Sequence, residues 1–236
     1  MPAIIASLTS WPKRIGMAHE TIESIMDQSQ APDSVELNLF TGDFPNGRQD
    51  VPQRILDLEN YGPLRIYFHD RDLKVWLKSY PAIKRHDGEE YILFTLDDDC
   101  VYARDYIKEA VASLDAGDYD AINTQSGICL DGVWQGIAGE YMAYRSKFLH
   151  DCLAYLNDDF CERVMVDDCA WFWLFRKFNV KQAPRTSDGL ARDRLLGFSY
   201  RRCFNPGDAS AMTKNNGEYP MERLIDEMEY MHTVGL

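Results

Sequence analysis

Short apolar runs and amphipathic helical stretches alternate along the first half of this 236-residue chain. Runs rich in β-branched and aromatic residues lie at 3–9, 35–40, 64–68, 91–96 and 119–123. Between them, apolar residues recur at helical spacing over 17–27, 51–59 and 104–116. Strand–helix alternation of this kind produces parallel sheets covered by helices. The pattern therefore predicts an α/β fold, a three-layer α/β/α sandwich with a mainly parallel central sheet.

The second half is less regular. Helical patterns lie at 147–156, within 164–178 and at about 221–231, and turn-rich polar segments occupy 185–194 and 205–220. The sequence has no internal repeat, no low-complexity tract and no clear linker, so we expect residues 1–236 to form a single domain.

The charge and the cysteines restrict the classes of partner and compartment. A formal net charge of −13 argues against binding to nucleic acid and against electrostatic adhesion to an anionic membrane. A local apolar patch for peripheral membrane association remains open. Six scattered cysteines without a CxxC pair are typical of reduced thiols in a cytosolic protein. The N-terminus does not resemble a signal peptide, and no apolar run reaches about 18 residues, so we expect a soluble cytoplasmic protein.

Three aspartates, Asp97, Asp98 and Asp99, directly follow the apolar run 91–96. Ligands of parallel sheets bind beyond the carboxyl ends of the strands, and the segment SLTS (7–10) also lies at that edge. Clustered carboxylates there suit a hard divalent ion that also binds substrate phosphates. Because alternate strand residues point the same way, we expect Asp97 and Asp99 to approach one ligand. Without a cation the triplet should be poorly satisfied. The alternative is a strand end with solvated aspartates that cap the next helix.

The segment LDDDCVY resembles the Asp-x-Asp motif of nucleotide-sugar glycosyltransferases with the glycosyltransferase A fold. The opening IIASLTSWPKRI, the following TIESIMDQSQAPDSVELNLF and the segment LKSYPAI are also similar to members of this group, including small bacterial ones. The resemblance implies a Rossmann-like, nucleotide-sugar-binding half over about 1–125 and an acceptor-binding half over about 126–236.

The resemblance also implies roles for the acidic residues. Asp97 would contact the ribose or nucleotide, and Asp99 would hold the metal, Mn²⁺ or Mg²⁺, that bridges the diphosphate. Asp98 would help either of them. The metal would neutralise the charge that develops on the leaving nucleoside diphosphate.

Further donor contacts are implied around the first strand. Ser7, Thr9 and Ser10 match the position that meets the base and ribose, and Arg14 and Lys78 are candidate diphosphate contacts. Ordinary strand-end hydrogen bonding is the alternative for Ser7 and Thr9. Arg192, Arg194, Arg201 and Arg202 form a basic group that either closes over a diphosphate or offsets nearby acids.

A second acidic site is VMVDDCAW. In the glycosyltransferase A fold, an acidic pair at a later helix start often faces the acceptor hydroxyl, and Asp167 and Asp168 match it. An inverting enzyme needs a general base there, whereas retaining members use the pair differently, so the stereochemical outcome stays open. A plain helix cap is the alternative.

The resemblance thus implies a metal-dependent glycosyltransferase of the hexosyl- or N-acetylhexosaminyl-transfer class, acting in polysaccharide biosynthesis. Its donor would be a nucleotide-sugar, most often a UDP-sugar, and its acceptor a hydroxyl of a glycan or a lipid-linked molecule. Two alternatives remain. One is a haloacid-dehalogenase-like phosphatase with Asp97 as nucleophile, although three strand patterns precede a motif that normally follows the first strand. The other is an inactive nucleotide-sugar-binding protein.

Overall fold

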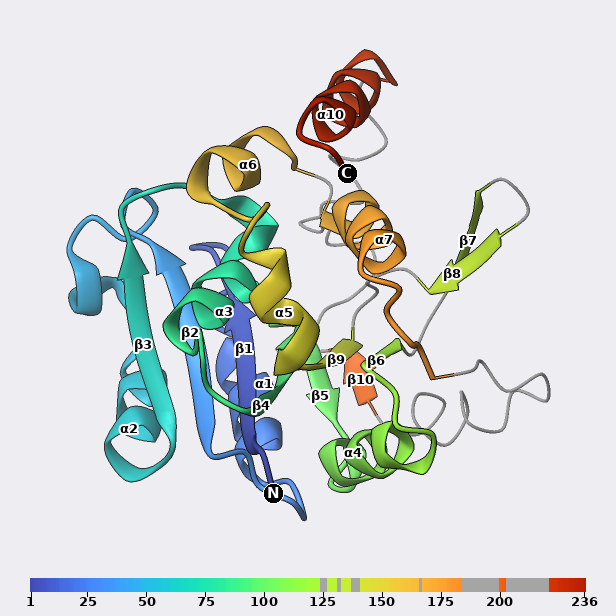
Figure 1. The fold of residues 1–236 in the computed structure, drawn as a ribbon. Coiled ribbons are helices and arrows are strands. Elements are labelled where there is room, and N and C mark those ends of the chain that lie inside the picture. Colours follow the sequence, from blue (N-terminus) through green and yellow to red (C-terminus); the bar gives the residue numbers. More distant parts are fainter. Residues whose placement is uncertain (124–126, 131–132, 137–140, 166, 184–199, 203–220) are drawn as a thin grey trace.

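The computed structural model describes the chain except residues 124–126, 131–132, 137–140, 166, 184–199 and 203–220 (Figure 1). Within the described elements, some side chains, including that of Asp168, are also outside the description.

A six-stranded sheet forms the centre of the molecule. Its strands run in the order β3 (Leu64–His69), β2 (Ser34–Phe40), β1 (Ala3–Thr9), β4 (Tyr91–Leu96), β9 (Tyr141–Arg145) and β6 (Ala121–Asn123). The first four strands are mutually parallel, and β9 runs antiparallel to both of its neighbours. The predicted mainly parallel sheet is therefore confirmed.

Helices cover both faces of this sheet, which completes the predicted three-layer sandwich (Figure 1). Residues of α1 (Ala18–Met26), α2 (Gln53–Tyr61) and α4 (Tyr106–Ala116) pack into the core on one face. The other core contains residues of α3 (Tyr80–Arg85), α5 (Ser146–Cys152), α6 (Asp158–Arg163), α7 (Asp167–Lys177) and α10 (Met221–Thr233). Two short 3₁₀ helices, η1 (Gly47–Asp50) and η2 (Lys74–Lys78), lie in the connections.

The central strands divide their side chains between the two cores. Along β4, Ile92, Phe94 and Leu96 pack on the α1 side, whereas Tyr91 and Leu93 pack on the α3 side. A strand buried on both faces has no solvent-facing side, which is why YILFTL is apolar apart from the buried Thr95. The register pairs Leu8 with Leu96, so β1 and β4 end at the same edge.

Two small sheets lie beside the main one. β5 (Cys100–Tyr102) pairs antiparallel with β10 (Tyr200–Arg202), and β7 (Gly127–Leu130) forms a hairpin with β8 (Val133–Gly136). The sequence patterns did not indicate these pairings. The predicted helix at 147–156 also ends early, at Cys152.

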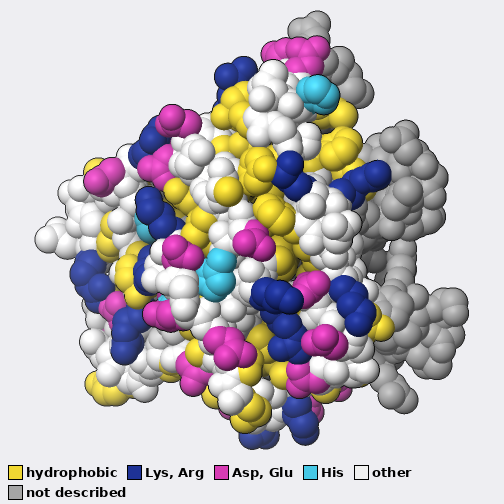
Figure 2. Space-filling model, in the orientation of Figure 1, with side chains coloured by type: hydrophobic (Ala, Val, Ile, Leu, Met, Phe, Trp, Pro, Cys, Tyr) yellow, Lys and Arg dark blue, Asp and Glu magenta, His cyan; other side chains and the backbone are white. Residues whose placement is uncertain are grey.

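Acidic and basic side chains are interspersed over the face of the molecule shown in Figure 2. Among the described helices, none combines the length and apolarity that crossing a bilayer would require.

Candidate active site

The three aspartates form a turn between β4 and β5, here called the acidic turn (Asp97–Asp99). Its backbone is fixed from two directions. The hydroxyl of Thr21 in α1 donates to the carbonyl oxygen of Asp98 at 2.9 Å, and the backbone N–H of Asp97 donates to the hydroxyl of Tyr102 at 3.1 Å. The turn is therefore held rigidly at the carboxyl edge of the sheet.

Asp98 and Asp99 share one guanidinium. Nη2 of Arg14 forms an ion pair with Oδ1 of Asp98 and lies 3.0 Å from Oδ1 of Asp99. The other oxygen of Asp98, Oδ2, accepts a hydrogen bond from Oγ of Ser10 at 2.5 Å. These side chains are mostly withdrawn from solvent: 13% of Arg14, 6% of Asp98 and 12% of Asp99 is exposed.

Burial dominates the acidity of Asp98. Loss of solvent raises the pKa of its carboxyl to about 7, against the opposing effects of Arg14 and the Ser10 hydrogen bond. The neighbouring carboxylates of Asp99 and Asp97 contribute to this upward shift of the pKa. A nearby positive charge is therefore needed to keep Asp98 ionised at neutral pH.

Lys78 connects the acidic turn to the second acidic site. Its Nζ lies 3.3 Å from Oδ1 of Asp97 and 4.0 Å from Oδ2 of Asp167. Asp167 is the first residue of α7, as the helix-start prediction requires, and its side chain is 8% exposed. Lys78 therefore lies between Asp97 and Asp167, the residues predicted for the donor side and the acceptor side.

Ser7 and Thr9 form hydrogen bonds with Asn38 of β2. Ser7 is fully buried, and its Oγ accepts a hydrogen bond from Nδ2 of Asn38 at 3.1 Å. Oγ1 of Thr9 donates to the carbonyl oxygen of Asn38 at 2.7 Å. These are strand-to-strand contacts between β1 and β2, so of the SLTS segment it is Ser10 that contacts the acidic turn.

The strand argument for the triplet is wrong, because residues 97–99 have left the strand, and the carboxylates that share a partner are Asp98 and Asp99. The expectation that the triplet is poorly satisfied without a cation stays a prediction. Arg14 and Lys78 contact the triplet, but the pKa of Asp98 is still raised to about 7 in their presence.

The sequence did not indicate that α1 residues would hold the acidic turn and the strand that follows it. Thr21 and Ser24 lie in α1, and Oγ of Ser24 accepts from the backbone N–H of Tyr102 at 3.0 Å. Hydroxyl side chains on the inner face of a predicted helix are the available signal, because a buried hydroxyl needs a partner.

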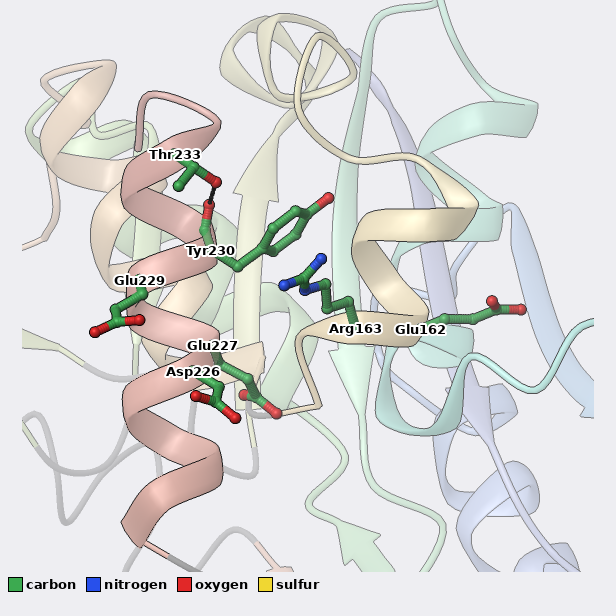
Figure 3. Close-up of a pocket in the computed structure, with 7 residues that line it drawn as sticks. All are labelled: Glu162, Arg163, Asp226, Glu227, Glu229, Tyr230 and Thr233. Atoms are coloured by element: carbon green, nitrogen blue, oxygen red, sulfur yellow. Dashed lines mark hydrogen bonds between the residues drawn. The ribbon is translucent and has the colours of Figure 1, made fainter.

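A cavity of about 710 Å³ lies apart from these residues, between α6 and α10 (Figure 3). Glu162, Asp226, Glu227 and Glu229 contribute to its lining, and the guanidinium of Arg163 lies 4.1 Å from the ring centre of Tyr230. An acidic lining repels a diphosphate, so this cavity is not a candidate donor site.

Comparison with solved structures identifies the architecture. A mannosyltransferase from Pyrobaculum calidifontis, in complex with GDP-Man and Mn²⁺, matches at a TM-score of 0.56 and 16% identity. The match covers 79% of this chain and 55% of that one. This chain has the glycosyltransferase A fold.

TarS from S. aureus (residues 1–349, in complex with UDP-GlcNAc) matches at a TM-score of 0.48 and 15% identity. That match covers 69% of this chain and 52% of TarS, so the chain spans about half the length of both structures. No family model and no curated protein matches the sequence.

The mannosyltransferase structure contains Mn²⁺, and the carboxylates of the acidic turn are of the ligand type that such an ion takes. Among the described residues, no three His, Cys, Asp or Glu side chains are grouped closely enough to hold an ion by themselves. Asp98 and Asp99 nevertheless direct two carboxylates at one cation, the Arg14 guanidinium. Two carboxylates completed by substrate phosphates are a usual Mg²⁺ or Mn²⁺ arrangement.

Five of the residues named in the predictions are not described, or have side chains that are not described. Arg192 and Arg194 lie outside the described residues, and the side chains of Asp168, Arg201 and Arg202 are not described.

Proposed function

We propose that this chain is a metal-dependent glycosyltransferase that moves a sugar from a nucleotide-sugar to a hydroxyl group. The donor is a UDP-sugar carrying a hexose or an N-acetylhexosamine, and the acceptor is a glycan or a lipid-linked molecule. The observation that carries the proposal is the acidic turn at the carboxyl ends of β1 and β4, with Arg14 and Lys78 beside it, in a glycosyltransferase A fold.

On the donor side, Asp99 holds Mn²⁺ or Mg²⁺ with help from Asp98, and Asp97 contacts the ribose. A bound divalent ion neutralises charge that develops on the leaving nucleoside diphosphate. Arg14 and Lys78 bring two further positive charges to the same edge, and Ser10 holds the orientation of Asp98. Ser7 and Thr9 support this edge through Asn38.

On the acceptor side, Asp167 accepts the proton of the attacking hydroxyl, with Asp168 beside it in the first turn of α7. The positive charge of Lys78 lies 4.0 Å from Oδ2 of Asp167 and attracts this carboxylate. Residues of about 1–125 bind the donor, and those of about 126–236 shape the acceptor site in a cytoplasmic enzyme of polysaccharide biosynthesis.

A thermal-stability screen tests this proposal. UDP, GDP and a panel of their sugar derivatives are each added with Mn²⁺ or with EDTA, and the melting temperature is recorded. Since a ligand that binds only the folded state stabilises it, we expect UDP or a UDP-sugar to raise the melting temperature with Mn²⁺ and far less with EDTA. Absence of stabilisation by every nucleotide would contradict the proposal.

Two variants separate the alternatives. Slow nucleotide-sugar hydrolysis that is lost in Asp99→Ala supports an enzyme over an inactive binding protein. A phosphorylated enzyme that is lost in Asp97→Asn would instead support the phosphatase, whose mechanism passes through an aspartyl phosphate. Neither the order of strands nor the fold favours that phosphatase.

A further inference from the structure

Arg14 lies where a cation would contact the acidic turn. Oδ2 of Asp98 accepts a hydrogen bond from Ser10, and Oδ1 of Asp98 forms the ion pair with Arg14. Oδ1 of Asp99 is directed at the same Nη2 of Arg14, at 3.0 Å. The two carboxylates therefore converge on one point, and the guanidinium already occupies it.

We propose that Arg14 is an internal counter-ion that competes with the divalent cation for Asp98 and Asp99 and that moves to the diphosphate when the donor binds. This inference rests on the proposed function, because it concerns how the same site takes up its metal and donor. It goes further in predicting that metal and nucleotide bind together rather than independently.

The charges explain the competition. Two carboxylates and one guanidinium leave one negative charge, whereas a divalent ion alone neutralises both carboxylates. The ion and the guanidinium cannot both approach the two Oδ1 atoms, because like charges in a mostly buried site repel strongly. Metal binding must therefore displace Arg14, and free protein binds the ion weakly.

The side chain of Arg14 is the part that moves. Its backbone is anchored, since its N–H donates to the carbonyl oxygen of Trp11 at 2.9 Å and its carbonyl oxygen accepts from Met17 at 2.9 Å. The next residue, Ile15, is buried in the core. A displaced guanidinium needs a new anionic partner, and a diphosphate offers oxygens that suit its planar fork.

Coupling between two ligands is reciprocal, so the nucleoside diphosphate should tighten binding of Mn²⁺ by the factor by which Mn²⁺ tightens the nucleotide. Arg14→Gln should change the two affinities in opposite directions. Binding of Mn²⁺ alone should tighten about tenfold, and binding of UDP should weaken by a similar factor, within the usual range of such couplings.

The test measures binding of Mn²⁺ to the purified protein by electron paramagnetic resonance, without nucleotide, and binding of UDP by calorimetry with Mn²⁺ at saturation. Arg14→Lys keeps the charge but not the fork, and should tighten Mn²⁺ less than Arg14→Gln does. Arg54→Gln, which removes a charge from the exposed Arg54–Glu23 pair, is the matched control and should change neither affinity.

Tighter Mn²⁺ binding in Arg14→Gln supports the inference. Unchanged or weaker Mn²⁺ binding in folded Arg14→Gln or Arg14→Lys overturns it, as does the absence of Mn²⁺ binding in every variant. The two proposals fail separately. If the Arg14 variants bind Mn²⁺ more tightly than wild type does but no nucleotide binds, the donor assignment fails. If UDP binds in the presence of Mn²⁺ but the variants bind Mn²⁺ no more tightly than wild type does, the proposed role of Arg14 fails.

Discussion

Nζ of Lys78 lies 4.0 Å from Oδ2 of Asp167. Lys78 is the last residue of η2 and Asp167 is the first residue of α7, so the contact joins segments that are far apart in the sequence. Through this contact a cation beside the acidic turn also faces the proposed base. Since Lys78 is 16% exposed and Asp167 is 8% exposed, water screens the pair only in part.

Replacing Lys78 by methionine should therefore impair transfer. The change keeps much of the side-chain length but leaves Asp97 and Asp167 without this positive charge. We expect kcat/KM to fall roughly 100-fold, as is typical when one electrostatic contact in an active site is lost. Lys78→Arg keeps the charge and should lose less. Steady-state kinetics check this, and equal activity of Lys78→Met and wild type would contradict it.

Asp98→Asn should destabilise the protein. The amide removes the cost of burying the Asp98 charge, but it cannot neutralise Arg14, which would keep only Asp99 as a carboxylate partner at this turn. We expect a loss of about 1–3 kcal/mol in the free energy of unfolding, below the cost of leaving a buried charge wholly uncompensated. Urea denaturation measures it. Glu23→Gln, in an exposed ion pair, should cost about 0.5 kcal/mol or less, and equal costs for both variants would contradict the account.

Trp76 connects the core to the site. It is fully buried in η2, its Nε1 donates to the carbonyl oxygen of Val164 at 2.6 Å, and its ring lies 5.7 Å from that of Trp171. Trp76→Phe loses the hydrogen bond and part of the ring, so we expect a cost of about 2 kcal/mol.

Because Trp76 joins the helix that carries Lys78 to the segment before α7, its substitution should also lower activity. Trp173→Phe, at a half-buried position of α7, is the control and should cost less stability. A chemical-denaturation series with parallel rate measurements tests this, and unaltered stability in Trp76→Phe would refute it.

His86 should make stability depend on pH. Nε2 of His86 lies 2.8 Å from Oε1 of the buried Glu36, and Nδ1 lies 2.8 Å from Oε2 of Glu89. Arg85 also pairs with Glu36, and the ring of Tyr91 packs against His86. Burial alone lowers the pKa of His86, but the hydrogen bonds with the two glutamates outweigh it and the net shift is upward.

A raised folded-state pKa means that the protonated form is favoured by folding. The contribution of His86 is fully present below its unfolded pKa of 6.5 and is lost as pH rises through the higher folded value. The difference in unfolding free energy between wild type and His86→Gln should therefore shrink as the pH rises above 6.5 and through the higher folded pKa. A difference that stays constant over this range would contradict the assignment.

The sequence predicts much of the fold over residues 1–125 because the relevant signals are local. The five runs rich in β-branched and aromatic residues all form strands of the main sheet, and the stretches with helical spacing form α1, α2 and α4. The later strand β9 was not predicted, because its pairing with β4 and β6 depends on distant segments rather than on its own pattern.

The candidate site is less accessible to sequence reasoning. The Ser10–Asp98 hydrogen bond joins residues 88 apart, and no local pattern distinguishes Ser10 from Ser7 or Thr9. The pairing of Asp98 with Asp99 at Arg14 follows from the turn after β4, which an alternating-strand argument does not include. Residue types indicated which edge of the sheet carries these charged side chains, but the partners of each residue required the tertiary structure.

The central claim is that the acidic turn supports metal-dependent cleavage of a nucleotide-sugar. Its most direct test is release of nucleoside diphosphate from UDP- and GDP-sugars by wild type and Asp99→Asn, each with Mn²⁺ and with EDTA. We predict release by wild type with Mn²⁺ and a loss of at least about 100-fold with EDTA or in Asp99→Asn. Release by Asp99→Asn, or by wild type in EDTA, that is as fast as release by wild type with Mn²⁺ would contradict the claim.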